Sequence, residues 1–335
     1  MPTINPSAPY PRLLGDVGGT HARFGWIAGP GERVAKVATY ACREQAGLDA
    51  AIAHYLADQR LAAPAAAAIA IATPVAGDTV AMTNLDWTFS IETLRRRFAL
   101  ERLLVLNDFS ALALAIPALA SSEVRQVGAG EAVAGAPVAL LGAGTGLGVS
   151  GLLHAQGGIL AIAGEGGHVT LAAADATEDR IVAWLRTRFG HVSAERVLSG
   201  DGLVNLYQAG CAIAGRKAET LQAVDVTSRA LVGSDAECRA AVEQFFAFLG
   251  SVAGDLALTL GARGGVYVGG GIVPQLGDWI DRSAFRARFE AKGRYRSYLA
   301  AIPTWTIDGT AAPALRGANR ALDDTPPGAY LAMAS

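Results

Sequence analysis

The chain has few cysteines, and they are widely separated. Cys42, Cys211 and Cys238 are the three in 335 residues, and no two of them have the C-x-x-C spacing. Such distant thiols argue against a structural zinc site and against a disulfide framework. We therefore expect a protein of the reducing cytoplasm.

The chain also has few lysines and little charge. None of Lys36, Lys217 and Lys292 lies in a Gly-Lys-Ser/Thr sequence, which excludes a Walker phosphate-binding loop. Charged residues make up 17% of the chain and the net charge is −2, so no basic surface for nucleic acid or for an anionic membrane is indicated. We expect small-molecule partners, with no nucleic-acid and no membrane partner.

Neither a signal peptide nor a membrane span is expected. The first six residues lack the charged and apolar regions of a signal peptide. The apolar run from Leu61 to Thr73 is short and is bounded by Pro64 and Pro74, so we predict a buried strand there. The hydrophobic content of 51% and the length fit two globular domains.

Glycine, by contrast, is abundant, and a glycine-rich turn occurs twice between strand-like apolar segments. The first copy is Leu13–Thr20, which reads LLGDVGGT, and the second is Leu140–Gly148, which reads LLGAGTGLG. Each predicts a β-hairpin whose bend leaves backbone N–H groups exposed in a concavity that suits phosphate oxygens. Two such hairpins, on two similar domains facing a cleft, would hold a triphosphate. The sequence therefore points to a nucleotide-using enzyme.

The segment Gly146–Gly151 matches the residue pattern of the dinucleotide-binding motif G-x-G-x-x-G. That motif must open a helix, whereas Leu152–Gly158 reads as a strand and a turn. We reject a dinucleotide site.

Hydrophobic periodicity predicts an α/β order of elements. The first half is expected to hold helices at 47–59, 91–98 and from 112 to Pro117, and strands at 67–72 and 103–106. A boundary is expected within 117–137, where Pro, Gly and Ser accumulate. The second half is expected to hold helices at 178–189, 202–211, 239–260 and 278–292, a strand at 265–268, a third glycine cluster at 269–271 and a last helix from 311 to about 322.

Several polar residues have two readings on the sequence alone. Asn107 and Asp108 follow a predicted strand, where open α/β sheets bind ligands, but Asp108 can also simply cap the next helix. Asp16 lies beside Gly18, Gly19 and Thr20, and on the sequence alone it can simply be a turn residue. Glu165 and His168 are three residues apart, which also suits a metal pair, although no third ligand motif is evident.

Six motifs then follow one another along the chain: LGDVGGT at 14–20, NDF at 107–109, GAGTGLG at 142–148, GEGGH at 164–168, ERVLSG at 195–200 and GGGIVP at 269–274. Together, from about residue 12 to 320, they closely resemble bacterial ATP-dependent glucokinases of the group that lacks the zinc-binding cysteine cluster, in the hexokinase/actin-like ATPase superfamily. The resemblance implies a two-domain actin-like ATPase (ribonuclease H-like) α/β fold with duplicated hairpin/α/β lobes around a cleft. It implies a small domain at 1–118 with a C-terminal helix at about 311–335, and a large domain at 119–310.

The resemblance also implies an activity, a homodimer and a set of site residues. ATP would phosphorylate the 6-hydroxyl of D-glucose with Mg²⁺, at the entry step of glycolysis, and Asp108 would be the base that accepts the hydroxyl proton. The implied glucose ligands are Asn107, Asp108, Glu165, His168 and Glu195. The implied ATP ligands, on the phosphate and adenosine sides, are Asp16, Gly18, Gly19, Thr20, Gly144, Thr145, Gly146, Gly269 and Gly270, with Mg²⁺ carried by ATP near Asp16.

Two alternatives to a glucose kinase stay open on the sequence. One is a kinase of another hexose, such as mannose or fructose, because the choice between epimers depends on fine placement of hydrogen-bonding groups. The other is a sugar-responsive regulator without catalysis, which we would expect to carry a helix-turn-helix extension or to have lost Asp108. ADP or polyphosphate as the phosphoryl donor also stays open.

Overall fold

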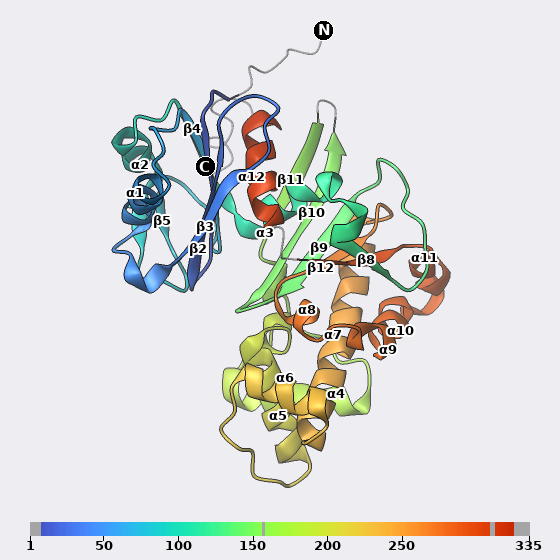
Figure 1. Cartoon of the computed structure of the whole chain (residues 1–335). Coiled ribbons are helices and arrows are strands. Elements are labelled where there is room, and N and C mark those ends of the chain that lie inside the picture. Colours follow the sequence, from blue (N-terminus) through green and yellow to red (C-terminus); the bar gives the residue numbers. More distant parts are fainter. Residues whose placement is uncertain (1–7, 156–157, 309–311, 325–335) are drawn as a thin grey trace. The chain divides into compact units, whose positions relative to one another are not determined.

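The computed structural model describes residues 8–155, 158–308 and 312–324, and the chain divides into two compact units (Figure 1). Unit 1 comprises Met1–Leu119, Leu152–Ala163 and Ala311–Ser335, and unit 2 comprises Ala120–Gly151 and Gly164–Thr310. Each unit has its own cluster of buried hydrophobic side chains. The domain limits expected at residues 118 and 310 remain a prediction.

Unit 1 is built on a five-stranded sheet of order β3-β2-β1-β4-β7. The first three strands form antiparallel hairpins, and β4 and β7 run parallel to β1. A separate small ribbon consists of β5 and β6. The strands are β1 (Arg12–Val17), β2 (His21–Ile27), β3 (Ala35–Ala41), β4 (Ala66–Ile71), β5 (Thr79–Ala81), β6 (Thr88–Ser90) and β7 (Arg102–Asn107).

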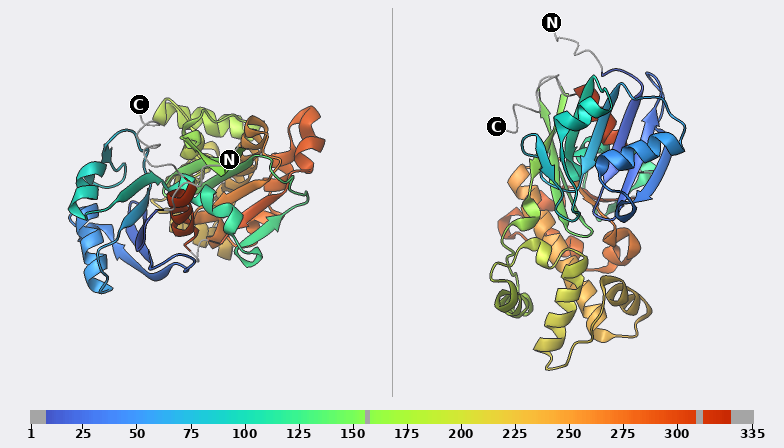
Figure 2. Two further views of the ribbon diagram at one scale, coloured as in Figure 1. Left: turned by 90° about the horizontal axis from the view of Figure 1, so that it is seen from above. Right: turned by 90° about the vertical axis from the view of Figure 1, so that its left-hand side faces the viewer.

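Helices cover both faces of this sheet. α1 (Leu48–Asp58) lies across the strands in the right-hand view of Figure 2, and its buried residues join α2 (Ile91–Arg97) and the odd-numbered residues of β1 and β4 in one core. α12 (Pro313–Asp324) packs on α3 (Asp108–Ala115) and on β1 and β4. The buried alanines of β4 permit this close approach, since a helix can lie nearer to a sheet whose side chains are small.

The second sheet has the order β11-β10-β9-β12-β13-β8. Its first five strands repeat the connectivity of the first sheet, a meander of three strands followed by two strands parallel to the first. The predicted duplication of a hairpin/α/β motif is confirmed by this shared order. The strands are β8 (Val124–Val127), β9 (Val138–Ala143), β10 (Leu147–Ala155), β11 (Gly158–Gly164), β12 (Val266–Gly269) and β13 (Thr304–Ile307).

The helices of unit 2 gather around α7, which is drawn in orange in Figure 1. Among the described residues, α7 is the one helix long and apolar enough to cross a membrane by length and composition, but 67% of its apolar window is buried against the rest of the chain. It packs on α5, α6, α10 and β9, so these contacts account for its apolar side chains. The helices are α4 (Ala176–Phe189), α5 (Gly200–Ile213), α6 (Ala223–Val232), α7 (Ala236–Leu260), α8 (Ile272–Gln275), α9 (Trp279–Arg282), α10 (Phe285–Glu290) and α11 (Arg296–Ala300).

The predicted continuous helix over 278–292 is wrong. The structure has two short helices, α9 and α10, with Ser283 between them in an extended conformation. The Ser283 hydroxyl donates to the carbonyl of Ile280 at 2.8 Å and accepts from the N–H of Phe285 at 3.2 Å. A side chain that bonds its own backbone in this way competes with the helical hydrogen bonds, and here it separates two helices.

Candidate active site

In the unit 1 sheet, the first glycine turn and the Asn107–Asp108 pair lie at the same side, at the carboxyl ends of β1 and β7. Val17, Ile71 and Asn107 are partners in register across β1, β4 and β7, so the ends of these strands lie in one row. The Gly18 N–H donates to the carbonyl of His21 at 3.0 Å and closes the turn that follows β1. Because β4 lies between β1 and β7, the usual spacing between neighbouring strands puts the first glycine turn and the Asn107–Asp108 pair about 10 Å apart.

At the end of β7, Asn107 caps the helix and Asp108 begins it. The Asn107 Oδ1 accepts from the N–H groups of Phe109 at 2.9 Å and Ser110 at 3.2 Å. The reading of Asp108 as the cap of this helix is therefore wrong. Asp108 is the first helical residue of α3, its Oδ1 accepts from the Phe109 N–H at 2.9 Å, and the residue is half-buried.

Asp16 lies one residue before the end of β1. Burial raises the pKa of Asp16 above its ordinary value of 3.8, and the charge of Arg23 partly offsets this effect. Arg23 Nη1 lies 4.0 Å from Asp16 Oδ2, since the two residues are paired in register across β1 and β2. The sequence analysis missed Arg23, although counting outward from the predicted hairpin would have paired it with Asp16.

The first glycine turn is braced by residues from two other segments. Cys42 Sγ donates to the carbonyl of Gly18 at 3.6 Å, and the Cys42 N–H donates to the carbonyl of Thr20 at 2.9 Å. A Cβ atom on Gly19 would lie 2.9 Å from the Cβ of Asn84, so a side chain at residue 19 would push this loop away. The sequence analysis missed both contacts because they join segments far apart in the chain.

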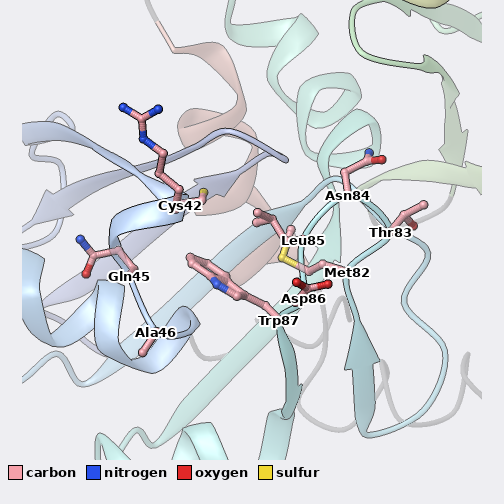
Figure 3. Close-up of a pocket in the computed structure, with 10 residues that line it drawn as sticks. Cys42, Gln45, Ala46, Met82, Thr83, Asn84, Leu85, Asp86 and Trp87 are labelled. Atoms are coloured by element: carbon pink, nitrogen blue, oxygen red, sulfur yellow. The ribbon is translucent and has the colours of Figure 1, made fainter.

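Beside this turn lies an open cavity of about 560 Å³ (Figure 3). Asn84 and Cys42 both line it, from different segments of unit 1. It contains none of the predicted site residues. The lining residues are Cys42, Arg43, Gln45, Ala46, Met82, Thr83, Asn84, Leu85, Asp86 and Trp87.

In the second sheet, the second glycine turn and the third glycine cluster are adjacent. The Gly144 N–H donates to the carbonyl of Gly146 at 2.8 Å and closes the turn between β9 and β10. Gly142 is paired in register with Gly269, and a Cβ atom on Gly142 would lie 2.5 Å from the Gly269 carbonyl carbon. Gly270 has a φ of 82° and would overlap Ala143 if it carried a side chain. The segments predicted to bind phosphate and adenosine thus pack backbone to backbone.

The predicted sugar residues of unit 2 lie next to this turn. Glu165 and His168 belong to one exposed glycine-rich loop, where the His168 N–H donates to the carbonyl of Glu165 at 3.0 Å. His168 Nδ1 lies 4.0 Å from Glu195 Oε1, and Glu195 Oε2 accepts from the N–H of Leu147 at 2.9 Å. The described residues contain no group of three or more His, Cys, Asp or Glu side chains placed to hold a metal, so the metal-pair reading of Glu165 and His168 gains no support.

Comparison with known proteins shows the family of this chain. The family model described as glucokinase matches residues 13–325. The glucokinase of Aromatoleum aromaticum is 55% identical over 97% of this chain and 98% of its own length, and that of Chromobacterium violaceum is 51% identical over 97% and 92%.

Among solved structures, the glucokinase from an Antarctic psychrotroph superposes with a TM-score of 0.85 at 35% identity, covering 94% of this chain and 99% of that one. A glucokinase of the ROK family from Streptomyces griseus, solved with glucose and AMPPNP, has a TM-score of 0.64 at 20% identity, covering 92% and 98%. These likenesses place the chain in the actin-like ATPase fold. The length and identity of the sequence matches show, further, that this chain belongs to the glucokinase family.

Proposed function

We propose that this chain transfers the γ-phosphoryl group of ATP to the 6-hydroxyl of D-glucose, giving glucose 6-phosphate and ADP, with Asp108 as the general base. Membership of the glucokinase family supports the reaction. The observation that supports the role of Asp108 is its half-buried place at the end of β7, as the first residue of α3.

Phosphoryl transfer has a loose transition state, so the enzyme mainly positions the reactants and stabilises charge. Asp108 accepts the proton of the 6-hydroxyl as that oxygen bonds to the γ-phosphorus and the bond to the ADP oxygen breaks. Asn107 orients the sugar with its amide N–H groups, since its side-chain oxygen is already bound to α3. Glu165, His168 and Glu195 bind other sugar hydroxyls.

The glycine turns bind the nucleotide. The backbone N–H groups of Gly19 and Gly146 and the hydroxyls of Thr20 and Thr145 donate to phosphate oxygens. Gly18 and Gly144 shape the two turns, since their own N–H groups donate to the carbonyls of His21 and Gly146. Both threonines are exposed at the tips of their turns. Gly269 and Gly270 lie against the adenosine, where a side chain would block the base.

The residues present fit a Mg²⁺ ion that is carried by ATP. Protein sites for Mg²⁺ in kinases use one or two carboxylates together with substrate phosphates. Asp16 offers one partly buried carboxylate beside the first turn, and Arg23 approaches it no closer than 4.0 Å. When bound there, Mg²⁺ would neutralise phosphate charge.

A single coupled assay tests this proposal. Glucose, mannose and fructose are each offered with ATP, ADP or polyphosphate, with and without Mg²⁺. We expect the highest kcat/KM for glucose with ATP and Mg²⁺. A higher kcat/KM for another hexose or another donor would replace glucose or ATP in the proposal, and no transfer to any sugar would overturn it.

We also propose a cytoplasmic homodimer. Cys42, Cys211 and Cys238 are all free and buried, which suits a reducing compartment. Light scattering checks the dimer, for which we expect a mass twice that of the 34.4 kDa chain.

A further inference from the structure

The Glu195 carboxylate lies close to two segments, the turn predicted to bind the ATP phosphates and the loop predicted to bind the sugar. Glu195 lies in a short 3₁₀ turn, Ala194–Arg196, and its Oε2 accepts from the N–H of Leu147 at 2.9 Å. Leu147 is the first residue after the glycine turn that we assign to the ATP phosphates. The other oxygen, Oε1, lies 4.0 Å from Nδ1 of His168 in the sugar loop.

The glycine turn is shaped to admit this carboxylate. A Cβ atom on Gly146 would lie 2.5 Å from Glu195 Oε2, so the position that a side chain would take is occupied by Glu195. Gly146 therefore has a reason to be glycine besides the exposure of its N–H group. The sugar loop is packed as closely, because a side chain on Gly167 would overlap the carbonyl of Leu147.

The backbone around Glu195 is anchored to helix α5. The Ser199 hydroxyl donates to the carbonyl of Glu195 at 2.9 Å and accepts from the N–H of Gly202 at 3.0 Å, as the cap of α5. The next residue, Gly200, donates its N–H to the carbonyl of Gly144 at 2.9 Å. The turn is thus held at Gly144 and at Leu147 by a segment fixed to a 14-residue helix.

The Glu195 side chain keeps 31% of its surface exposed. One carboxylate therefore offers an oxygen to a ligand on the sugar side while its other oxygen holds the nucleotide turn. A sugar hydroxyl that donates to Glu195 restricts the carboxylate, and the restriction passes to the Leu147 N–H and the turn.

We propose that Glu195 is a positioning residue for the nucleotide turn as well as a sugar ligand, and that it couples glucose binding to ATP binding. The inference rests on the proposed function. Coupling between two ligands is reciprocal, so each ligand tightens the binding of the other by the same factor. Loss of the Glu195 carboxylate then weakens nucleotide binding even when no sugar is present.

The test measures the affinity of the full chain for AMPPNP with Mg²⁺, by calorimetry, with and without glucose. We expect Glu195→Ala to weaken AMPPNP binding without glucose by about tenfold, the scale of one lost hydrogen bond to a charged group. Glu195→Gln keeps an oxygen that accepts from Leu147 and should retain most of that affinity. Glu165→Gln is the matched control: within the described part of the chain its side chain makes no hydrogen bond or ion pair with the turn, so this variant should lose glucose affinity only.

A direct readout follows the Leu147 amide by NMR in protein labelled with ¹⁵N-leucine. Its proton resonance should move upfield in Glu195→Ala and stay in place in Glu195→Gln and Glu165→Gln. Wild-type affinity for AMPPNP in folded Glu195→Ala, or an unmoved Leu147 resonance, overturns the coupling. If Glu195→Ala does not fold, Glu195→Met takes its place, because methionine fills a similar space without a carboxylate oxygen to accept from Leu147. Wild-type AMPPNP affinity in folded Glu195→Met overturns the proposal. A wild-type chain that fails to phosphorylate glucose overturns the proposed function instead.

Discussion

At the scale of single residues, Asn107 and Asp108 have different tasks: Asn107 caps helix α3, and Asp108 is the proposed general base. Asn107 holds the start of α3 through its side-chain oxygen, and the Oδ1 atom of Asp108 accepts from the Phe109 N–H. We expect Asp108→Asn to bind glucose nearly as well as the wild type while kcat falls by at least about 10²-fold, the scale of a lost general base. Turnover by the coupled assay and glucose affinity by calorimetry check this.

The matched control is Asn107→Asp, since Asp caps a helix about as well as Asn. This variant should keep its melting temperature but lose glucose affinity, because the amide donors are gone. If Asp108→Asn turns over at close to the wild-type rate, Asp108 is not the base.

Asp16 has a charge that the folded chain accommodates poorly. Because burial raises its pKa above 3.8, the folded state holds the Asp16 proton more tightly than the unfolded state. Ionised Asp16 therefore costs stability above the folded-state pKa, and the cost disappears as pH falls below the unfolded value near 3.8. We expect Asp16→Asn to raise the melting temperature at pH 7.5, and this gain to shrink as the pH is lowered towards 4.

Differential scanning fluorimetry across that pH range measures the effect, with Asp86→Asn, at an exposed aspartate of the same unit, as the control. ATP-dependent activity should fall in Asp16→Asn, because the carboxylate proposed to face Mg²⁺ is lost. A gain in stability that is independent of pH would mean that the Asp16 charge is not its cause.

At the scale of secondary-structure elements, Gly317 sets the distance between α12 and α3. A side chain on Gly317 would overlap the carbonyl of Ala111, in the middle of the helix that begins with Asp108. Overpacking of this kind typically costs about 1–3 kcal/mol. We expect Gly317→Ala to lower the melting temperature and, because α3 must shift, to lower kcat more than it raises the KM for ATP.

Gly210→Ala is the control for glycine replacement within a helix. Its Cβ atom would meet only the far end of the flexible Glu237 side chain, at 3.0 Å, and alanine favours the helix. We expect this variant to be at least as stable as the wild type. Equal loss of stability in both variants would show that the loss in Gly317→Ala does not come from the close packing of residue 317 on Ala111.

The elements also show how far the sequence can predict this molecule. Local signals were sufficient for the hairpins and for most helices: the helix predicted at 91–98, for example, is present as α2, and the Ser90 hydroxyl before it accepts from the N–H of Thr93 at 3.0 Å. The continuous helix over 278–292 was wrong, because periodicity does not register a serine that bonds its own backbone.

In the candidate site, residue types and motif order predicted the segments but not their contacts. Nothing local connects Glu195 with Leu147, which are 48 residues apart, or Asn84 with Gly19. Such contacts depend on how loops return to the sheet edges, and only the folded chain specifies them. The roles of the site residues remain predictions for the kinetic tests above.

At the scale of the whole molecule, two elements of unit 1 that lie about 300 residues apart in sequence, β1 and α12, are connected by side-chain hydrogen bonds. Arg12, at the start of β1, is fully buried and donates to Asn319 Oδ1 at 2.8 Å and to Asp323 Oδ1 at 2.7 Å. Both partners lie on α12. The Arg12 guanidinium is buried, whereas the Asp323 side chain is 41% exposed. Since a buried charge that loses its partner is destabilising, α12 is tied to unit 1 by charge as well as by packing.

This leads to a prediction about cooperative unfolding. Elements that share a core open together, whatever their distance in sequence. We expect amide hydrogen exchange, followed by mass spectrometry, to show α12 exchanging at the rate of β1 and α3 and not at the rate of β13, which lies next before it in sequence but belongs to unit 2. Asp323→Asn should accelerate exchange in α12, β1 and α3 together while α5 and α7 keep their rates. If α12 alone became faster, the helix would be an appendage of unit 1, and the shared core inferred from Arg12 and Gly317 would not exist.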